Sequence, residues 1–398
     1  EPAESEQFPV LTLTGSTTIS DNTSDLDGGG IYAKHARVNL NGGTVESNRS
    51  SRDGGGVYVE NGFLQLFQAT VKGNQGSENG GGIAVKNCGF DIATSEIYEN
   101  EVKNGGGVAI LGSDTKSDSH AVQAGTNIHE NTAYRYGGGI YAQDAEFQLN
   151  SLTIEKNSAD NNGGGGVMAL RCKLTAIYAT LSKNTCNQEG GGIAAFWTDL
   201  SIKRSEFLGN RSNYGGAIYL RNQPGPEAPK DDSAPLPECH ISEKTTMSGN
   251  KAYKGGALFA ATNTKATFDD CSLTSNVSSS GGWGGGICAQ SADTITLKHT
   301  SVSGNKAQST RNTKSQGGGI YVTTAADYKS QLILTDGSVI EKNEAGNGGG
   351  IYITGNSSVT VNGSQISDNQ AAGTNRSASG GGGIFAENGP TVTLSSAT

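Results

Sequence analysis

Two short signatures alternate along the whole chain, and no other feature restricts its fold as strongly. One is a glycine pair or run followed by an aliphatic residue, and the other is an apolar residue, two variable residues and then Asn. Each signature occurs thirteen times, always in the order Asn and then glycines. Seven of the twelve intervals between successive asparagines are 26 residues, and the others are 27, 29, 31, 38 and 40. A fixed period of this length is typical of a solenoid built from stacked repeats.

The two signatures define thirteen positions each. The aliphatic residues that end the glycine signature are Ile31, Val57, Ile83, Val108, Ile140, Val167, Ile193, Ile218, Leu258, Ile287, Ile320, Ile351 and Ile384. The asparagines that end the other signature are Asn22, Asn48, Asn74, Asn100, Asn131, Asn157, Asn184, Asn210, Asn250, Asn276, Asn305, Asn343 and Asn369.

The content of one repeat decides between the solenoid types. The repeat that begins at Gly54 holds three short runs of alternating residues, rich in Val, Leu and aromatics and separated by Gly, Asn and Ser. No copy holds a run with helical spacing, which excludes the helical repeats, and the unit is too short for a propeller blade. We therefore predict an all-β fold, a right-handed parallel β-helix of about 13 coils of roughly 26 residues, with residues 1–398 as a single domain.

Both signatures have an architectural interpretation. Glycines at a corner permit positive φ and a close approach to the next coil. An Asn at the same turn of every coil tolerates the left-handed conformation, and its side chain could hydrogen-bond along the stack. We therefore predict a structural Asn ladder formed by the thirteen asparagines.

The first strand of each repeat follows the glycines, and its second position is rich in aromatic residues. A period of two places the first and third residues of this strand inside and the second and fourth outside. Tyr or Phe fills eight of the thirteen second positions. An exposed row of rings could stack on a sugar chain or anchor a protein partner, and the other interpretation is that the rings only pack on one another along the strands. The residues that we predict to bind are Tyr219, Phe259, Tyr321, Tyr352 and Phe385.

Insertions between repeats mark the variable surface. The longest is a Pro-rich loop at about residues 222–238, and shorter loops are expected near 113–120, 278–283, 308–316 and 371–379. Loops on a solenoid are common binding sites, but they are also the places that best tolerate extra residues.

Charge and cysteine content exclude several classes of partner. The net charge is −9, whereas a nucleic-acid partner would require a basic stripe. The six cysteines include no CxxC pair, and the five histidines share no metal-ligand spacing, so we expect no metal and no cofactor. No apolar stretch is long enough to span a membrane as a helix, so any membrane anchor is expected in segments absent from this chain.

Acidic residues were compared between coils, because many parallel β-helices are enzymes that act on polysaccharides with clustered carboxylates. At the outward positions of the first strand, no two neighbouring coils both carry an acid. The closest acidic pairs in sequence are Asp231–Asp232 and Asp269–Asp270, and we interpret both as solvated. No GxSxG, HExxH or phosphate-binding motif occurs. We therefore expect a protein without enzymatic activity.

The alternating motifs resemble those of a known family. Phe207 and Asn210, followed by Gly215, Gly216, Ala217 and Ile218, form one repeat with both an FxxN and a GGAI tetrapeptide. In most other copies the glycine motif is GGGI or GGGV, and Ile, Val, Leu or Met replaces Phe. In these motifs, over essentially its whole length, the chain resembles the passenger region of chlamydial-type polymorphic membrane proteins, which are autotransported adhesins, and also similar repeat proteins on other bacterial surfaces.

The resemblance implies a function and a location. It implies an adhesin passenger on the bacterial outer membrane or in secreted form, whose partner is a host-cell surface protein or glycan, with self-association as a further interaction. Two alternatives stay open. One is a carbohydrate-active enzyme similar to a polysaccharide lyase or hydrolase, with substrate along the first sheet, and the other is a structural stalk without a ligand.

Overall fold

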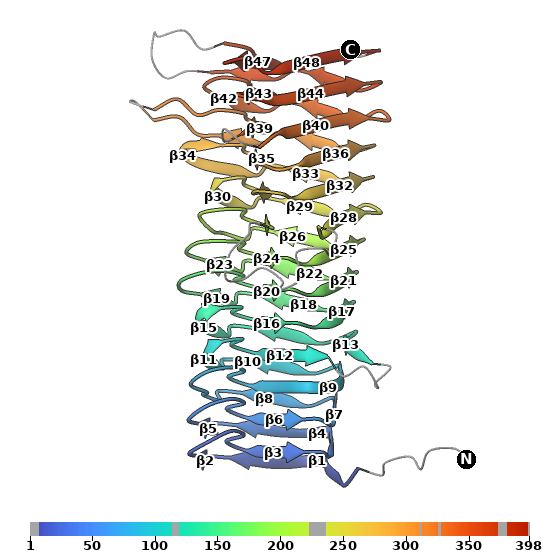
Figure 1. The fold of residues 1–398 in the computed structure, drawn as a ribbon. Coiled ribbons are helices and arrows are strands. Elements are labelled where there is room, and N and C mark those ends of the chain that lie inside the picture. The colour runs from blue at the N-terminus through green and yellow to red at the C-terminus, as the bar shows by residue number, and fades with distance from the viewer. Residues whose placement is uncertain are drawn as a thin grey trace, which may run out of the picture.

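The computed structural model describes residues 8–113, 119–222, 236–310, 313–324, 328–372 and 380–396. These residues form strands and turns and no helix. Coils of chain stack in sequence order into a rod, with the N-terminus at one end and the C-terminus at the other (Figure 1). The prediction of an all-β parallel β-helix with about 13 coils is therefore confirmed.

The first sheet contains the strand that follows the glycines in each of the thirteen repeats. Its members are β3 (Ile31–Lys34), β6 (Val57–Glu60), the first half of β9 (Ile83–Ala93), β12 (Val108–Ser113), β16 (Ile140–Gln143), β20 (Val167–Leu170), β24 (Ile193–Phe196), β27 (Ile218–Arg221), β31 (Leu258–Ala260), β35 (Ile287–Gln290), β39 (Ile320–Thr323), β43 (Ile351–Thr354) and β47 (Ile384–Glu387).

The second sheet follows the first after a short turn. Its members are the start of β1 (Val10–Ser20), the start of β4 (Arg37–Glu46), β7 (Phe63–Phe67), the second half of β9, β13 (His120–Val122), β17 (Glu146–Asn150), β21 (Lys173–Ile177), β25 (Asp199–Lys203), β28 (Glu238–Ser242), β32 (Lys265–Asp269), β36 (Thr294–Lys298), β40 (Ser330–Thr335), β44 (Ser357–Asn362) and β48 (Thr391–Ser395).

The third sheet consists of three-residue strands that end just before the ladder asparagines. Its members are the ends of β1 and β4, then β8 (Thr70–Lys72), β10 (Glu96–Tyr98), β14 (Asn127–His129), β18 (Thr153–Glu155), β22 (Thr180–Ser182), β26 (Glu206–Leu208), β29 (Thr246–Ser248), β33 (Ser272–Thr274), β37 (Ser301–Ser303), β41 (Val339–Glu341) and β45 (Gln365–Ser367).

Most coils add a fourth strand, which the three apolar runs of the repeat did not predict. It follows the ladder Asn directly and is often only two residues long, too short to produce an alternating pattern in the sequence. Its members are β2 (Thr23–Ser24), β5 (Arg49–Ser50), β11 (Glu101–Asn104), β15 (Thr132–Tyr136), β19 (Ser158–Ala159), β23 (Thr185–Cys186), β30 (Lys251–Lys254), β34 (Val277–Trp283), β38 (Lys306–Ala307), β42 (Glu344–Ala345) and β46 (Gln370–Ala371).

Among the described residues, all strand pairs are parallel and join each coil to the next, and the register shifts only within the pairs β1–β4, β11–β15 and β30–β34. Leu174 of β21 pairs with Leu200 of β25, and Leu200 in turn pairs with Cys239 of β28. Residues of one kind therefore form columns along the rod, and the inward columns fill its interior with a continuous apolar core. This core supplies the main stabilisation, because the hydrophobic effect scales with the apolar area that is removed from water.

The glycines at the corner of each coil are required by backbone conformation and by space, as the run 54–56 illustrates. Gly54 has φ of +62°, which residues with a Cβ rarely adopt. A Cβ on Gly55 would lie 2.3 Å from the carbonyl oxygen of Gly81 in the next coil, so a side chain there would collide with backbone. The first glycine therefore sets the turn, and the second permits the close stacking of coils.

The thirteen asparagines lie in one column and are joined by side-chain hydrogen bonds at all twelve steps. Asn48, for example, donates from its backbone N–H at 3.0 Å and from Nδ2 at 3.1 Å to Oδ1 of Asn74. The positive φ that we expected at these asparagines lies instead at the preceding residue, such as Ser47 with φ of 54°. The Asn side chain is used for the ladder, so the preceding residue makes the left-handed turn.

The predicted loops have different outcomes. The segment 278–283 is a strand and not a loop, because it lies within β34, where the pairing with β30 shifts register to absorb the extra residues. Of the Pro-rich loop, residues 223–235 lie outside the described residues, as do 114–118, 311–312 and 373–379 of the shorter loops.

Candidate functional site

The second position of the first strand points out of the rod interior, but it does not reach solvent along most of the rod. Tyr219 and Phe259 are each 5% exposed, Tyr321 is 4% exposed and Tyr352 is 1% exposed. Phe385, in the last coil, is partly buried. The prediction that these five residues form an exposed aromatic row is therefore wrong. Among the rings of this column, the exposed one is Tyr32 in the first coil, which is 53% exposed and lies far along the rod from the five predicted residues.

Neighbouring rings in the column stack on one another. The ring centroids of Tyr219 and Phe259 are 5.4 Å apart, those of Tyr321 and Tyr352 are 5.3 Å apart, and those of Tyr352 and Phe385 are 5.2 Å apart. The alternative interpretation of this column, in which the rings pack on one another along the strands, describes this arrangement.

The rings are covered by the connection that leads from the fourth strand back to the glycines. Tyr214, the residue before a glycine corner, lies with its ring centroid 5.5 Å from that of Phe259. Trp283 holds the same position in a later coil and stacks on Tyr321 at 4.9 Å. These contacts form a second apolar cluster on the outer side of the first sheet, separate from the core of the rod. A ligand cannot reach the predicted binding residues unless this cover moves.

The residues of the FxxN and GGAI motifs lie inside the rod or at its corner. Phe207, Asn210, Ala217 and Ile218 are all fully buried. Gly215 has φ of +64°, and a Cβ on Gly216 would lie 2.3 Å from the carbonyl oxygen of Gly256. These residues therefore build the coil and are not available to a partner.

The second sheet presents an outer face that none of the described residues covers. Its strands alternate between exposed or partly buried residues and buried residues, for example in β25 and β28. In the middle of the rod the first outward position carries Lys173, Asp199, Glu238, Lys265 and Thr294. The third outward position carries Thr175, Ser201, His240, Thr267 and Thr296.

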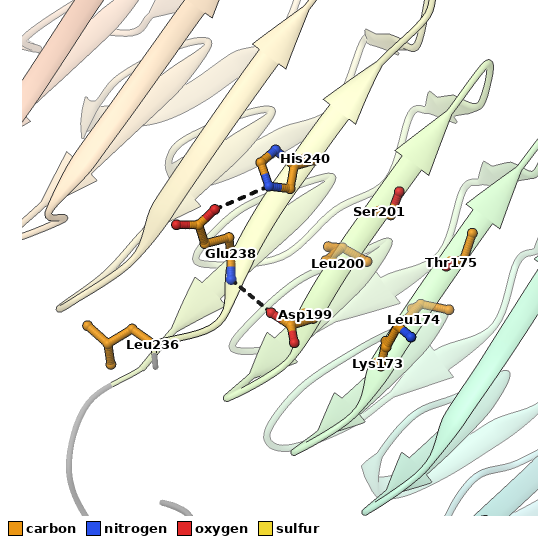
Figure 2. A pocket seen from close by; sticks show the side chains of 9 residues that line it. All are labelled: Lys173, Leu174, Thr175, Asp199, Leu200, Ser201, Leu236, Glu238 and His240. Atoms are coloured by element: carbon orange, nitrogen blue, oxygen red, sulfur yellow. Dashed lines mark hydrogen bonds and ion pairs between the residues drawn. The ribbon is translucent and has the colours of Figure 1, made fainter. Parts of the chain in front are cut away.

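Two adjoining cavities lie on this face. The larger has a volume of about 390 Å³ and extends from Lys173 on β21 to His240 on β28, with Leu236 at its rim (Figure 2). The smaller has a volume of about 250 Å³ and continues over β32 to Thr296 on β36. Because both cavities are lined by Glu238 and His240, we treat them as one groove and call it the open groove.

The carboxylates of the open groove lie on neighbouring coils. The backbone N–H of Glu238 donates to Oδ1 of Asp199 at 3.1 Å, which holds the Asp199 carboxylate beside the next strand (Figure 2). Within the part of the chain that the structure describes, Asp199 forms no ion pair. The side chain of Glu238 lies 3.3 Å from Nε2 of His240 and 3.7 Å from Nζ of Lys265.

Negative charge exceeds positive charge in and beside the groove. Lys173 lies 2.7 Å from Glu146, and this hydrogen bond raises the pKa of the Lys173 ammonium group. Lys265 also lies 3.9 Å from Asp293. The groove itself is lined by two carboxylates, Asp199 and Glu238, and two ammonium groups, and Glu146 and Asp293 lie beside it and pair with those ammonium groups. Such a groove suits a neutral or amino-bearing ligand better than a polyanion.

The sequence contained a signal for this groove that our comparison of acids did not use. We compared acidic residues only on the first strand of each repeat, whereas Asp199 and Glu238 open the second strand of two neighbouring coils. The 40-residue interval that contains the Pro-rich loop separates them in the sequence and hides their proximity. Alignment of the second strands by the ladder Asn that follows each of them would have placed the two acids within one position of each other, because Asp199 lies 11 residues before Asn210 and Glu238 lies 12 residues before Asn250.

The remaining features considered in the sequence are the two acidic pairs, metal-binding clusters, the cysteines and membrane-spanning helices. Asp269 is exposed at the end of β32 and Asp270 makes the following left-handed turn, whereas Asp231 and Asp232 lie outside the described residues. Among the described residues, no three His, Cys, Asp or Glu side chains are grouped to hold a metal ion. All six cysteines are buried and form no disulfide. The described residues contain no helix that could cross a lipid bilayer.

Comparison with known proteins identifies the architecture and no closer relative. The family model described as a right-handed β-helix region matches residues 10–177, 122–302 and 198–398. No curated protein and no solved structure matches the chain significantly.

Proposed function

We propose that this chain, which belongs to the family of right-handed β-helix regions, is a surface-displayed, non-enzymatic adhesin that binds a host-cell glycan in the open groove. The observation that carries this proposal is the groove itself, a hydroxyl-rich and charged hollow that crosses five strands on a face of the second sheet that no described residue covers. Surface display and a host partner are supported by the resemblance of the FxxN and GGAI motifs to those of bacterial adhesin passengers.

The groove suits an extended ligand that runs along the rod. Columns of Thr, Ser and His side chains repeat at the strand spacing of about 4.8 Å, so the same polar groups recur from coil to coil. A sugar chain offers hydroxyl groups that repeat in a comparable way and can exchange hydrogen bonds with these side chains. The excess of carboxylates in and beside the groove favours neutral or amino-bearing sugars over uronate polymers.

A glycan array tests this proposal directly. The chain should bind neutral or amino-bearing glycans, and the double variant Asp199→Asn with Glu238→Gln should bind amino-bearing glycans at least about tenfold more weakly, since each charged contact is worth about 1.5–3 kcal/mol. Asp269→Asn is the matched control, because Asp269 is also an outward acid of the second sheet and does not line the groove. Equal binding by the double variant and the control would refute the proposal.

A hydrolase is the second candidate, and one observation favours it. Asp199 and Glu238 place two carboxylates on neighbouring coils, and glycoside hydrolysis commonly uses such a pair as acid and base or nucleophile. The assay is release of reducing ends from the glycans that bind. We expect none, and release that Asp199→Asn abolishes would establish the hydrolase in place of the adhesin.

A further inference from the structure

A third cavity lies on the fourth sheet, away from the open groove. It has a volume of about 270 Å³ and is lined by Arg49, Ser50, Gln75, Gly76, Glu101 and Tyr134, among others. We call it the Gly76 pocket. Arg49, Gln75 and Glu101 hold the same position in three successive coils, directly after the ladder Asn, and are joined by parallel bridges.

Gly76 lines the pocket at a position that is tightly packed against its neighbours. In successive coils this column carries Ser50, Gly76 and Val102, where Ser50 and Val102 are buried. A Cβ on Gly76 would lie 3.1 Å from Cγ2 of Val102 and 3.3 Å from the carbonyl oxygen of Arg52. Even an alanine would therefore force Val102 or the backbone of Arg52 to shift.

Ser50, which lines the pocket, carries a buried polar atom that no group of the described residues satisfies. The residue is 1% exposed, and among the described residues its Oγ has no hydrogen-bond partner. Serines at the equivalent position in other coils are paired with backbone carbonyl oxygens. Oγ of Ser24 donates to the carbonyl oxygen of Asp27, and Oγ of Ser212 lies within hydrogen-bond distance of the carbonyl oxygens of Tyr214 and Gly215. Ser278 is also unpaired but does not line the Gly76 pocket. An unpaired buried hydroxyl at the wall of a cavity is suited to bond a ligand.

The charges of the pocket differ from those of the open groove. Arg49 is exposed and forms no ion pair among the described residues, so its guanidinium group is available. Oε2 of Glu101 accepts a hydrogen bond at 3.3 Å from Nε2 of Gln75, which holds this carboxylate beside Gln75, whose position is one coil away from that of Arg49. Two strand spacings of about 4.8 Å separate the Arg49 and Glu101 positions, a distance suited to one or two sugar rings.

We propose that the Gly76 pocket binds a carboxylate-bearing sugar unit. Arg49 receives the carboxylate, since its planar guanidinium forms two parallel hydrogen bonds to such a group. Ser50 and Gln75 exchange hydrogen bonds with the sugar hydroxyls. Tyr134, which is 48% exposed at the rim, packs its ring against the apolar face of the sugar. This site does not depend on the open groove. The Gly76 pocket is proposed to prefer an anionic ligand, whereas the open groove is proposed to prefer a neutral or amino-bearing one.

Three monosaccharides that differ at single positions test the proposal. D-Glucuronate, D-glucose and D-glucosamine are titrated against the full chain and followed by saturation-transfer NMR. We expect glucuronate to bind most tightly and glucosamine most weakly. Arg49→Gln should weaken glucuronate binding at least about tenfold, because a charge-assisted pair is lost. Arg211→Gln is the matched control, since Arg211 holds the same column position in a later coil and should leave binding unchanged.

A second variant separates recognition from folding. Ser50→Ala removes a buried hydroxyl that the protein leaves unpaired, so the melting temperature should stay the same or rise while glucuronate binding falls about tenfold. The proposal is overturned if none of the three sugars binds, if glucosamine binds most tightly, or if Arg49→Gln and Arg211→Gln bind glucuronate equally. It is also overturned if Ser50→Ala binds as the unmodified chain does.

Discussion

The outer faces of the first and second sheets have the same local geometry and opposite exposure. On both faces every second side chain points away from the rod interior. On the first sheet Tyr219 and Phe259 are covered by Tyr214 and neighbouring residues. On the second sheet Thr267 and Thr296 border the open groove. The direction of a side chain relative to the rod interior therefore does not decide whether solvent reaches it.

The difference arises from the lengths of the connections. In most coils the first and second sheets, and the second and third, are joined by short turns built on a left-handed residue, such as Asn61 or Gln68; the longer connections are β12–β13, β27–β28 and β39–β40. The short turns cannot fold over a sheet. The segment from the ladder Asn to the next glycines is longer, and it returns along the outer side of the first sheet. Tyr214 and Trp283 lie on this segment, immediately before the glycines.

The largest effect on stability is expected when one phenylalanine is removed from the outer face of the first sheet, and a second variant removes one from the outer face of the second sheet for comparison. Phe259→Ala should lower the free energy of unfolding by about 3–5 kcal/mol, because the ring is 5% exposed, stacks on Tyr219 and contacts the tilted ring of Tyr214. Phe67→Ala, on the outer face of the second sheet, removes a ring that is 45% exposed and should change the free energy of unfolding by about 0.5 kcal/mol or less. Denaturant unfolding measures both. Equal losses would mean that the two faces are covered alike.

A smaller effect is expected when the cover is removed and the covered residues stay in place. Trp283→Ala should cost about 2 kcal/mol, because Trp283 is only partly buried while it stacks on Tyr321. Cys288 lies on the covered face between Phe259 and Tyr321, and burial raises the pKa of its thiol to about 12. This thiol should resist alkylation in the unmodified chain and react in the variant.

Peptide mass spectrometry after alkylation locates the label. Cys239 is the internal control, because it lies in the core of the rod and should stay unlabelled in both proteins. If Cys288 reacts equally in the variant and the unmodified chain, Trp283 is not part of the cover.

The smallest effect is expected at the turn between the two faces. Asp144 makes this turn with φ of 54°, and the hydrogen bond from Arg171 in the next coil, 2.6 Å from Nε to Oδ1, lowers the pKa of its carboxyl group. A carboxyl group whose pKa is lower in the folded state stabilises the fold above its unfolded pKa of about 3.9, and this stabilisation is lost as pH falls through the folded pKa. Since Asp144 is half exposed, we expect only about 0.5 kcal/mol.

Unfolding midpoints measured from neutral pH down into the acid range report this contribution, because it is lost as pH falls through the folded pKa of Asp144. Asp144→Asn should remove that part of the pH dependence. Asp336→Asn is the control, since Asp336 makes a similar left-handed turn and has no ion pair among the described residues. An unchanged pH dependence in Asp144→Asn would show that the pair does not stabilise the turn.

The sequence also contained a signal for the covered face. The second position of the first strand is Tyr, Phe, Ala, Met or Cys in every copy, so this strand is apolar at three consecutive positions. Such a continuous apolar run is typical of a strand that is buried on both faces, whereas an alternating pattern indicates one open face. The second strands, with Lys173, Asp199 and Glu238 at their first position, follow the alternating pattern.

The sequence by itself determined the parallel β-helix, its thirteen coils, the inward columns and the place of the Asn ladder. These follow from local periodicity, because a strand alternates with period two and a stacked coil repeats its corner residues. Only the tertiary structure decided which segment covers the outward column of the first sheet, that the backbone of Glu238 holds the Asp199 carboxylate, and that a cavity is lined by Ser50 and Gly76. These features depend on how a connection of one coil folds over another and on register across insertions, and neither is encoded in the pattern of a single repeat.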